Sequence, residues 1–231
     1  MQACRLAALD LACRRGDRVL FRGLGFALGQ GEALHLAGPN GVGKSSLIRI
    51  LAGLLRPYAG SVEREGALAL ADERPALDGH LALGRALEFW RNFDRAEHAT
   101  FDAAVETLGL RDLLDVPVRY LSTGQRKRAA LARTLLAGAP VWLLDEPLNG
   151  LDTATTAAVE GLVAAHIGQG GIAVIASHQP FALDGMARLE LSSAGHPSPS
   201  GEGPGVGAVV QELRQPNNPH TNPSPGGERL K

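Results

Sequence analysis

The sequence predicts an α/β fold in which buried strands alternate with helices. Residues 33–37 and 141–144 are short, mainly apolar runs of the kind that form strands covered on both faces of a sheet. A similar run, residues 172–176, follows after one interval of helical length. Residues 46–52, which come after the first run, carry apolar side chains at helical spacing. This alternation is typical of a sheet with helices packed against it.

The segments outside this pattern predict two further substructures. Between residues 6 and 28, apolar and polar residues alternate on both sides of a turn at residues 14–17, as in an antiparallel hairpin. Residues 77–136 have a helical pattern, with apolar side chains three or four positions apart that we expect to lie mostly in a core. Examples of these apolar side chains are Leu83, Leu87, Trp90 and Phe93.

Composition limits the possible functions. The net charge of −1 predicts no nucleic-acid partner, and we interpret Arg126, Lys127, Arg128 and Arg133 as a solvated helix face. The two cysteines lack the spacing of a metal site or a disulfide framework, which favours a reduced cytoplasmic protein. No run approaches the roughly 20 apolar residues of a membrane span, so work at a membrane would require another chain.

The chain is expected to divide into one domain over residues 1–192 and a tail over residues 193–231. The tail is rich in Ser, Gly, Pro and Asn, so it cannot bury enough apolar surface to fold. We therefore expect it to be disordered and dispensable for the folding of the domain.

Residues 38–45 form the most informative motif of the chain. They match the pattern G-x-x-x-x-G-K-[ST] and stand between a predicted strand and a predicted helix, as a phosphate-binding loop requires. Its glycines let backbone N–H groups point toward the β- and γ-phosphates at the helix N-terminus. Lys44 adds a positive charge, and the Ser45 hydroxyl can ligate Mg²⁺. The expected nucleotide contacts here are Gly38, Pro39, Asn40, Gly41, Val42, Gly43, Lys44, Ser45 and Ser46.

Two acidic residues follow the apolar run at residues 141–144. Open α/β sheets place ligands at the carboxyl ends of their strands, so Asp145 and Glu146 are expected beside the phosphate loop. Asp145 can hold Mg²⁺ through water, and Glu146 can polarise the attacking water in hydrolysis. A strand that ends in a solvated acidic turn would show the same residues, but the phosphate loop favours a nucleoside triphosphatase. We expect Ser45 and Asp145 at the metal, and Glu146 and Lys44 as catalytic residues.

Residues 121–125, with the sequence LSTGQ, stand at the start of a predicted helix that continues to residue 136. Ser122 and the Gly124 N–H can meet a γ-phosphate at the positive end of the helix dipole. We include Gln125, the last residue of the motif, among the expected nucleotide contacts. Taken alone, the segment would be interpreted more simply as a capped amphipathic helix without a ligand.

Together, these motifs resemble those of the ATP-binding cassette (ABC) ATPases and occur in the order of that family. Residues 121–125 are similar to the family's signature motif, with Thr123 where glycine is usual. Residues 149–152 resemble its D-loop, which links two sites, and this places Asp152 among the expected nucleotide-binding residues. His178 resembles the switch histidine that contacts the γ-phosphate, a catalytic position in the family.

The resemblance implies a P-loop NTPase of the ABC ATPase type. Its fold would combine a RecA-like mixed-sheet core with an antiparallel β-subdomain and a helical subdomain at about residues 77–136. ATP and Mg²⁺ are the implied substrate and cofactor. The implied assembly is a head-to-tail homodimer in which Ser122, Gly124 and Gln125 face nucleotide bound to the other subunit. In related transporters, a membrane subunit docks in the groove beside the helical subdomain.

The chain departs from the family pattern at two places. The first hairpin has no aromatic residue on which adenine could stack, and we expect Arg15 to serve instead. The switch glutamine is missing from residues 71–75, where we place Arg74 in its position, with Glu73 adjacent. Because a guanidinium has only donors and repels a metal, we expect Arg74 to point away from Mg²⁺, toward the membrane-subunit groove or the γ-phosphate.

A narrower resemblance covers roughly residues 3–191. Residues 13–15, 18–28 and 177–180 are similar to those of the CcmA family, the ATPase subunits of bacterial cytochrome c maturation, also called haem exporter ATP-binding proteins. This implies a peripheral ATPase on the cytoplasmic face of the inner membrane that couples hydrolysis to haem delivery. Its implied partners are a CcmB-like membrane subunit, a CcmC-like protein and a haem chaperone, whose release hydrolysis would drive. The chain has no C-x-x-C-H motif, so no direct haem binding is predicted.

Other functions stay open from the sequence. The chain could serve another small ABC exporter. Soluble ABC proteins of translation or DNA repair usually carry two cassettes or a long coiled-coil insertion, and neither is present here. A catalytically silent cassette is suggested by Arg74 and Thr123. The residues that argue against it are the intact Lys44, Asp145, Glu146 and His178.

Overall fold

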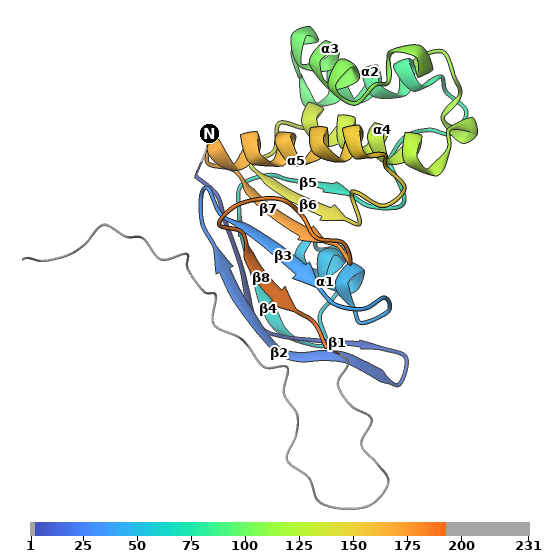
Figure 1. Ribbon diagram of the computed structural model, residues 1–231. Helices are drawn as coiled ribbons and strands as arrows, with labels where there is room; N and C mark the ends of the chain where they lie inside the picture. The colour runs from blue at the N-terminus through green and yellow to red at the C-terminus, as the bar shows by residue number, and fades with distance from the viewer. Residues whose placement is uncertain (1–2, 193–231) are drawn as a thin grey trace, which may run out of the picture.

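A parallel sheet stands at the centre of the computed structural model, with helices on one side and a helix and a second sheet on the other (Figure 1). The structure describes residues 3–192, so the tail expected over residues 193–231 lies outside it. The five strands of the central sheet have the order β5-β6-β7-β3-β8, and their pairs are parallel. They are β3 (Ala33–Ala37), β5 (Leu68–Ala71), β6 (Val141–Asp145), β7 (Ile172–Ala176) and β8 (Ala187–Glu190).

The second sheet has three antiparallel strands in the order β2-β1-β4. Strands β1 (Arg5–Arg15) and β2 (Arg18–Leu28) form the hairpin that the alternating sequence predicts, and β4 (Ala59–Glu65) pairs with β1. The two sheets together give the expected combination of a core sheet, whose pairs are all parallel within residues 3–192, and an antiparallel subdomain. The three predicted core strands β3, β6 and β7 are confirmed, whereas β4, β5 and β8 were not predicted.

The helices occupy different faces of the central sheet. Helix α1 (Lys44–Leu51) lies between the two sheets, and α5 (Thr153–Gly168) covers the opposite face (Figure 1). Helices α2 (Leu83–Asp94), α3 (His98–Thr107) and α4 (Thr123–Leu136) contact one another and form the expected helical subdomain. Short 3-10 turns at Arg111–Leu113 and Val118–Tyr120 join α3 to α4.

Side chains of the central strands alternate between two hydrophobic cores. In β6, Val141 and Leu143 face the core shared with α1 and the antiparallel sheet, and Trp142 and Leu144 face the core shared with the other helices. This period of two is the geometry of a strand, and it explains why buried central strands carry continuous apolar runs. The strand ends are thereby held rigidly, which positions the residues that follow them.

The helical subdomain buries only part of its apolar sequence. Leu83 and Leu87 are fully buried, as expected, but the expectation for Phe93 is wrong: its side chain is 70% exposed, and Phe89 is 58% exposed. Both rings lie on the face of α2 away from the core and stack with each other at 6.4 Å, with Trp90 packed edge-on against them. Within residues 3–192, no helix is long and apolar enough to cross a membrane.

Candidate active site

The loop between β3 and α1 has the backbone geometry of an anion-binding site. Gly43 precedes the helix with a φ of 122°, which a residue with a side chain rarely adopts. A Cβ there would lie 3.2 Å from the Leu20 Cβ, so the glycine also lets strand β2 pack against the loop. No side chain caps α1, and its first N–H groups therefore remain available to a ligand.

Lys44, at the first position of α1, is 95% buried, and its ammonium lies within the loop. Its Nζ donates to the carbonyl oxygens of Gly38 at 2.7 Å and Pro39 at 3.3 Å, and lies 3.6 Å from Glu146 Oε1. The side chain is only 5% exposed. A buried ammonium with neutral acceptors on one side and a carboxylate on the other can bind phosphate oxygens as a charged donor.

Ser45 and Asp145 join α1 to the end of β6. The Ser45 Oγ donates to Asp145 Oδ1 at 3.1 Å. Burial raises the pKa of Asp145, the Ser45 hydrogen bond opposes this, and the nearby carboxylates of Glu146, Asp72 and Glu73 add to the increase. A buried carboxylate among other carboxylates is a site that a cation would stabilise, and its oxygen donors suit Mg²⁺. Within residues 3–192, no group of three or more His, Cys, Asp or Glu side chains is arranged to hold a metal alone.

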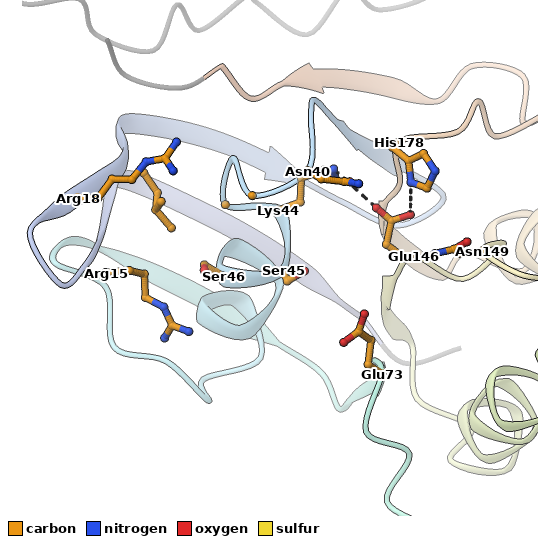
Figure 2. A pocket seen from close by; sticks show the side chains of 13 residues that line it. Arg15, Arg18, Asn40, Lys44, Ser45, Ser46, Glu73, Glu146, Asn149 and His178 are labelled. Carbon is orange, nitrogen blue, oxygen red and sulfur yellow. Dashed lines mark hydrogen bonds and ion pairs between the residues drawn. The ribbon is translucent and has the colours of Figure 1, made fainter. Parts of the chain in front are cut away.

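Glu146 and His178 follow the neighbouring strands β6 and β7. The Glu146 N–H donates to the Ala176 carbonyl at 2.7 Å, which fixes the residue with a φ of 50°. His178 Nδ1 lies 2.8 Å from Glu146 Oε2, so Lys44 and His178 hold the two carboxylate oxygens from different sides (Figure 2). The Glu146 carboxylate is 16% exposed, so it is fixed in direction but reachable by water.

These side chains surround a pocket of about 520 Å³. Sequence-predicted residues at its walls are Arg15, Asn40, Gly41, Gly43, Lys44, Ser45, Ser46, Glu146 and His178. The sequence did not identify Arg18, Leu20 or Asn149 as site residues, and it placed Glu73 only beside the expected switch position; all four line the pocket. The alternation of the hairpin could have identified Arg18, because it lies two positions before Leu20 and hence on the same face of β2. Val42, within the loop, is buried and does not line the pocket.

The comparisons with known proteins agree with the sequence motifs. The family model described as ABC transporter matches residues 21–149. A Novosphingobium aromaticivorans protein named "Cytochrome c biogenesis ATP-binding export protein CcmA" is 62% identical over 83% of this chain and 97% of its own length. A protein of the same name from Sphingopyxis alaskensis is 52% identical over 80% of this chain and 96% of its own length.

The chain belongs to the CcmA family of ABC transporter proteins.

Solved structures support the fold. One titled "Structure of ATP binding subunit of ABC transporter" has a TM-score of 0.72 at 21% identity, covering 81% of this chain and 86% of its own. A bacterial Atm1-family ABC exporter with ATP bound has a TM-score of 0.71 at 23% identity, covering 84% of this chain and 38% of its own. The expected ABC ATPase fold is therefore confirmed.

The switch region of this CcmA-family chain differs from its predicted register. Glu73, rather than Arg74, lines the nucleotide pocket, whereas Arg74 lines a neighbouring groove with Arg49 and Arg133. The physical cause is a turn after β5, in which the Arg74 N–H donates to Asp72 Oδ1 at 2.9 Å. Arg74 thus lies outside the nucleotide pocket, which agrees with the expectation that it avoids the metal, and its neighbour Glu73 lines the pocket.

The family's signature residues lie outside the pocket. Ser122 caps α4 by accepting from the Gln125 N–H at 3.2 Å, and the Gln125 side chain accepts from the Ser122 N–H at 2.8 Å. These two bonds form a capping box. Asp152 caps α5 by accepting from the Thr155 N–H at 2.8 Å, and this hydrogen bond lowers the pKa of Asp152. Within one chain, none of these residues reaches the lining of the nucleotide pocket.

The signature motif and the D-loop of this CcmA-family chain are packed together. A Cβ at Gly124 would lie 2.7 Å from the carbonyl oxygen of Gly150, so glycine is required for this close approach. The two motifs are thus in contact in a single subunit.

Three of the four basic residues of α4 are bound to other elements, contrary to the interpretation as a solvated face, and the fourth, Arg126, is exposed. Lys127 donates to the Glu146 backbone carbonyl at 2.5 Å. Arg128 donates to the carbonyls of Leu108 and Gly109, each at 2.9 Å. The Arg133 guanidinium stacks over the Trp90 ring at 4.0 Å. Of the basic residues on this helix, these three connect α4 to other elements, because their long stems can cross the helix surface to reach distant acceptors.

Proposed function

We propose that this protein is the ATP-hydrolysing subunit of a CcmAB-type membrane complex in c-type cytochrome biogenesis. The observation that supports hydrolysis is the Glu146 carboxylate, held between Lys44 and His178 at the wall of the pocket. The observation that supports the pathway is 62% identity to a protein named for cytochrome c biogenesis. Hydrolysis would be coupled to haem delivery or to release of a haem chaperone.

Each side chain at the site has a separate proposed task. Lys44 and the N–H groups at residues 41–45 bind the β- and γ-phosphates. The Glu146 carboxylate accepts a hydrogen bond from the attacking water and takes its proton as the bond to phosphorus forms. His178 holds the carboxylate in direction and contacts the γ-phosphate. Phosphoryl transfer requires mainly positioning and charge stabilisation, which these groups supply.

Ser45 and Asp145 are the residues that would hold Mg²⁺. The Ser45 Oγ and the Asp145 Oδ1 are 3.1 Å apart; Ser45 lines the pocket, and Asp145 is buried at the end of β6 next to it. When bound, Mg²⁺ supplies positive charge that neutralises the phosphate oxygens. Ser45 and Asp145 would contribute by fixing the position of Mg²⁺ relative to the phosphate oxygens.

The signature residues support a head-to-tail homodimer. Ser122, Gly124, Gln125 and Asp152 remain proposed nucleotide contacts, supplied to the site of the partner subunit. Their position at the N-terminal ends of α4 and α5 suits this task, because helix N-termini favour anions. A mixture of a Lys44→Ala chain and a Ser122→Arg chain tests it. Only the mixed dimer has one complete composite site, so activity should return on mixing; continued inactivity of a mixture that contains heterodimers would contradict the proposal.

The domain organisation and the partners form part of the same proposal. Residues 1–192 constitute the ABC ATPase domain, with its helical subdomain at about residues 77–136. The protein sits peripherally on the cytoplasmic face of the inner membrane, on a CcmB-like integral subunit and with CcmC-like and haem-chaperone partners. We propose neither nucleic-acid binding nor direct haem binding.

Two experiments test the proposed function. The first measures phosphate release by the purified chain and by Lys44→Ala, which should lose both hydrolysis and tight ATP binding. Unchanged turnover in this variant would exclude the site. The second expresses the chain in a bacterium that lacks its own CcmA and measures covalent haem in c-type cytochromes. Restoration by the wild-type chain and not by Lys44→Ala supports the pathway, whereas hydrolysis without restoration would indicate another ABC function.

A further inference from the structure

A polar residue is buried in the middle of strand β3. His35 is the central residue of Ala33–Ala37, whose other residues are apolar, and it is only 5% exposed. Burying a polar ring costs free energy unless its nitrogen atoms find hydrogen-bond partners. The partner of His35 therefore explains what a histidine supplies here that another apolar residue would not.

The His35 ring contacts the backbone that leads out of the neighbouring strand β7. Its Nε2 lies 3.2 Å from the carbonyl oxygen of Ser177, the residue that follows β7. A carbonyl oxygen only accepts, so Nε2 carries the proton and donates. Burial lowers the pKa of His35, and the hydrogen bond to Ser177 opposes this decrease. A lowered pKa favours the neutral ring, with its single proton on Nε2.

Three hydrogen bonds anchor Ser177. Its N–H donates to the Leu36 carbonyl at 3.2 Å, its Oγ accepts from the Gln179 N–H at 2.9 Å, and its carbonyl accepts from His35. This carbonyl belongs to the same planar peptide as the N–H of His178. In the part of the chain that the structure describes, the backbone of His178 makes no hydrogen bond to another backbone group. The bond from His35 therefore fixes the peptide plane that leads into His178.

His178 connects this peptide to the site of hydrolysis. Its Nδ1 lies 2.8 Å from Glu146 Oε2, and the two side chains point toward each other (Figure 2). His178 lines both the nucleotide pocket and a separate, smaller pocket of about 330 Å³, whereas His35 lines only the smaller one. An effect of His35 on hydrolysis would therefore act through the Ser177–His178 peptide rather than through contact with the nucleotide.

We propose that His35 is a positioning residue for hydrolysis. By donating to the Ser177 carbonyl, it sets the direction of the His178 ring and, through that ring, of the Glu146 carboxylate. This role rests on the proposed function, because it takes His178 and Glu146 as parts of the hydrolytic site. A displacement of about 1 Å at a reacting group can lower a rate by about 100-fold, so the loss of this one hydrogen bond should be visible in turnover.

Replacements of His35 in the full chain separate the hydrogen bond from the volume of the ring. His35→Leu fills similar space but cannot donate, so kcat for phosphate release should fall about tenfold while the Kd for ATP stays within about threefold of wild type. His35→Gln can place an amide N–H where Nε2 lies and should restore kcat to within about threefold of wild type. His35→Asn carries the same amide one methylene closer to the backbone, so it cannot reach Ser177 and should behave as His35→Leu.

His166→Leu is the matched control for the loss of a buried imidazole. His166 is also 5% exposed, and its Nε2 also lies 3.2 Å from a backbone carbonyl, that of Ile172. Ile172 begins β7, at the opposite end of the strand from Ser177. The control should therefore lower the unfolding temperature, as His35→Leu does, but leave kcat near that of wild type. Phosphate release, calorimetric ATP binding and thermal unfolding are measured for every variant.

A double-mutant cycle with His178→Ala checks that His35 acts through the His178 ring. His178→Ala should lower kcat by itself, and adding His35→Leu should lower it no further, because the ring that His35 directs is gone. A further fall as large as that in the single His35→Leu variant would overturn the positioning role.

Two other results would also decide the question. Equal kcat values for His35→Gln and His35→Asn would overturn the positioning role, and this comparison holds even if His35→Leu does not fold. Wild-type turnover in His178→Ala would instead remove His178 from the hydrolytic site, which contradicts the proposed function as well. Loss of turnover in His178→Ala with wild-type turnover in His35→Leu would overturn the role of His35 alone.

Discussion

Lys127 Nζ donates to the backbone carbonyl of Glu146 at 2.5 Å, which links helix α4 directly to the residue that follows β6. Glu146 adopts a φ of 50°, in the left-handed region that residues other than glycine rarely occupy. Burial lowers the pKa of Lys127, and the carboxylates of Glu146, Glu73 and Asp145 oppose this decrease. The ammonium thus stabilises both a strained backbone and a cluster of like charges.

Lys127→Met should lower the turnover number by about tenfold while the Kd for ATP stays within about threefold of wild type. Methionine keeps the length of the side chain but cannot donate, so the Glu146 backbone would relax and its carboxylate would lose its direction. The measurement is kcat for phosphate release together with calorimetric ATP binding. Arg126→Met, one position earlier on an exposed site of α4, is the matched control and should behave as wild type. Equal kcat values for both variants and the wild type would contradict the positioning role.

Glu146→Gln should lower turnover by about 10²- to 10³-fold with ATP binding retained. The amide keeps the shape of the side chain but cannot take a proton from water. It can still contact His178, which lies 2.8 Å from the carboxylate in the wild-type chain. Single-turnover phosphate release, with ATP binding measured in parallel, checks this expectation. Near-normal turnover would exclude Glu146 as the base.

Arg74→Gln should leave basal hydrolysis within about twofold of wild type and alter its stimulation by the membrane subunit. Arg74 lines the groove shared with Arg49 and Arg133, away from the nucleotide pocket. Glu73→Gln is the matched contrast, because Glu73 lines the nucleotide pocket. Removing its negative charge beside the triphosphate should tighten ATP binding by about fivefold, corresponding to roughly 1 kcal/mol. Basal rates and stimulation that are unchanged in Arg74→Gln would show that Arg74 takes no part in coupling.

The local motifs of this chain were predictable because each depends on short-range backbone chemistry. The phosphate loop requires glycine and lysine at fixed spacing, and the buried strands β3, β6 and β7 require apolar runs, so both are visible in the sequence. The same holds for Ser122 at the start of α4, since capping involves residues three positions apart.

Features that depend on long-range packing were not predictable. The contact of Lys127 with Glu146 joins residues 19 positions apart, and nothing in a basic helix segment distinguishes it from a solvated face. Glu73 rather than Arg74 lines the nucleotide pocket, within a turn in which the Arg74 N–H donates to Asp72 Oδ1, and residue spacing alone does not show which of two adjacent side chains faces the pocket. The exposure of Phe93 depends on which face of α2 meets α3 and α4, whereas spacing alone reveals only that an apolar face exists.

His166, on helix α5, is a buried ionisable group that packs against the central sheet. Its ring stacks on Trp142 with centroids 3.9 Å apart and an interplanar angle of 10°, and its Nε2 lies 3.2 Å from the Ile172 carbonyl. Burial lowers the pKa of His166, and hydrogen bonds to the carbonyls of Ile172 and Pro140 only partly oppose this. The folded chain therefore binds this proton less readily than the unfolded chain does.

The protein should lose stability in acid through His166, because an ionisable group with a lowered pKa in the folded state stabilises the fold only while it is neutral. That stability is complete above the ordinary value of 6.5 and is lost as the pH falls from there through the lower folded-state pKa. His166→Phe keeps a flat ring against Trp142 but cannot be protonated, so its unfolding temperature should depend less on pH between about 7.5 and 5 than that of the wild type, even if it is lower at neutral pH. His98→Phe is the matched control, since the His98 side chain is 70% exposed on α3. Thermal unfolding followed by circular dichroism at several pH values distinguishes the variants: a His166→Phe profile parallel to that of wild type would show that His166 does not cause the acid sensitivity.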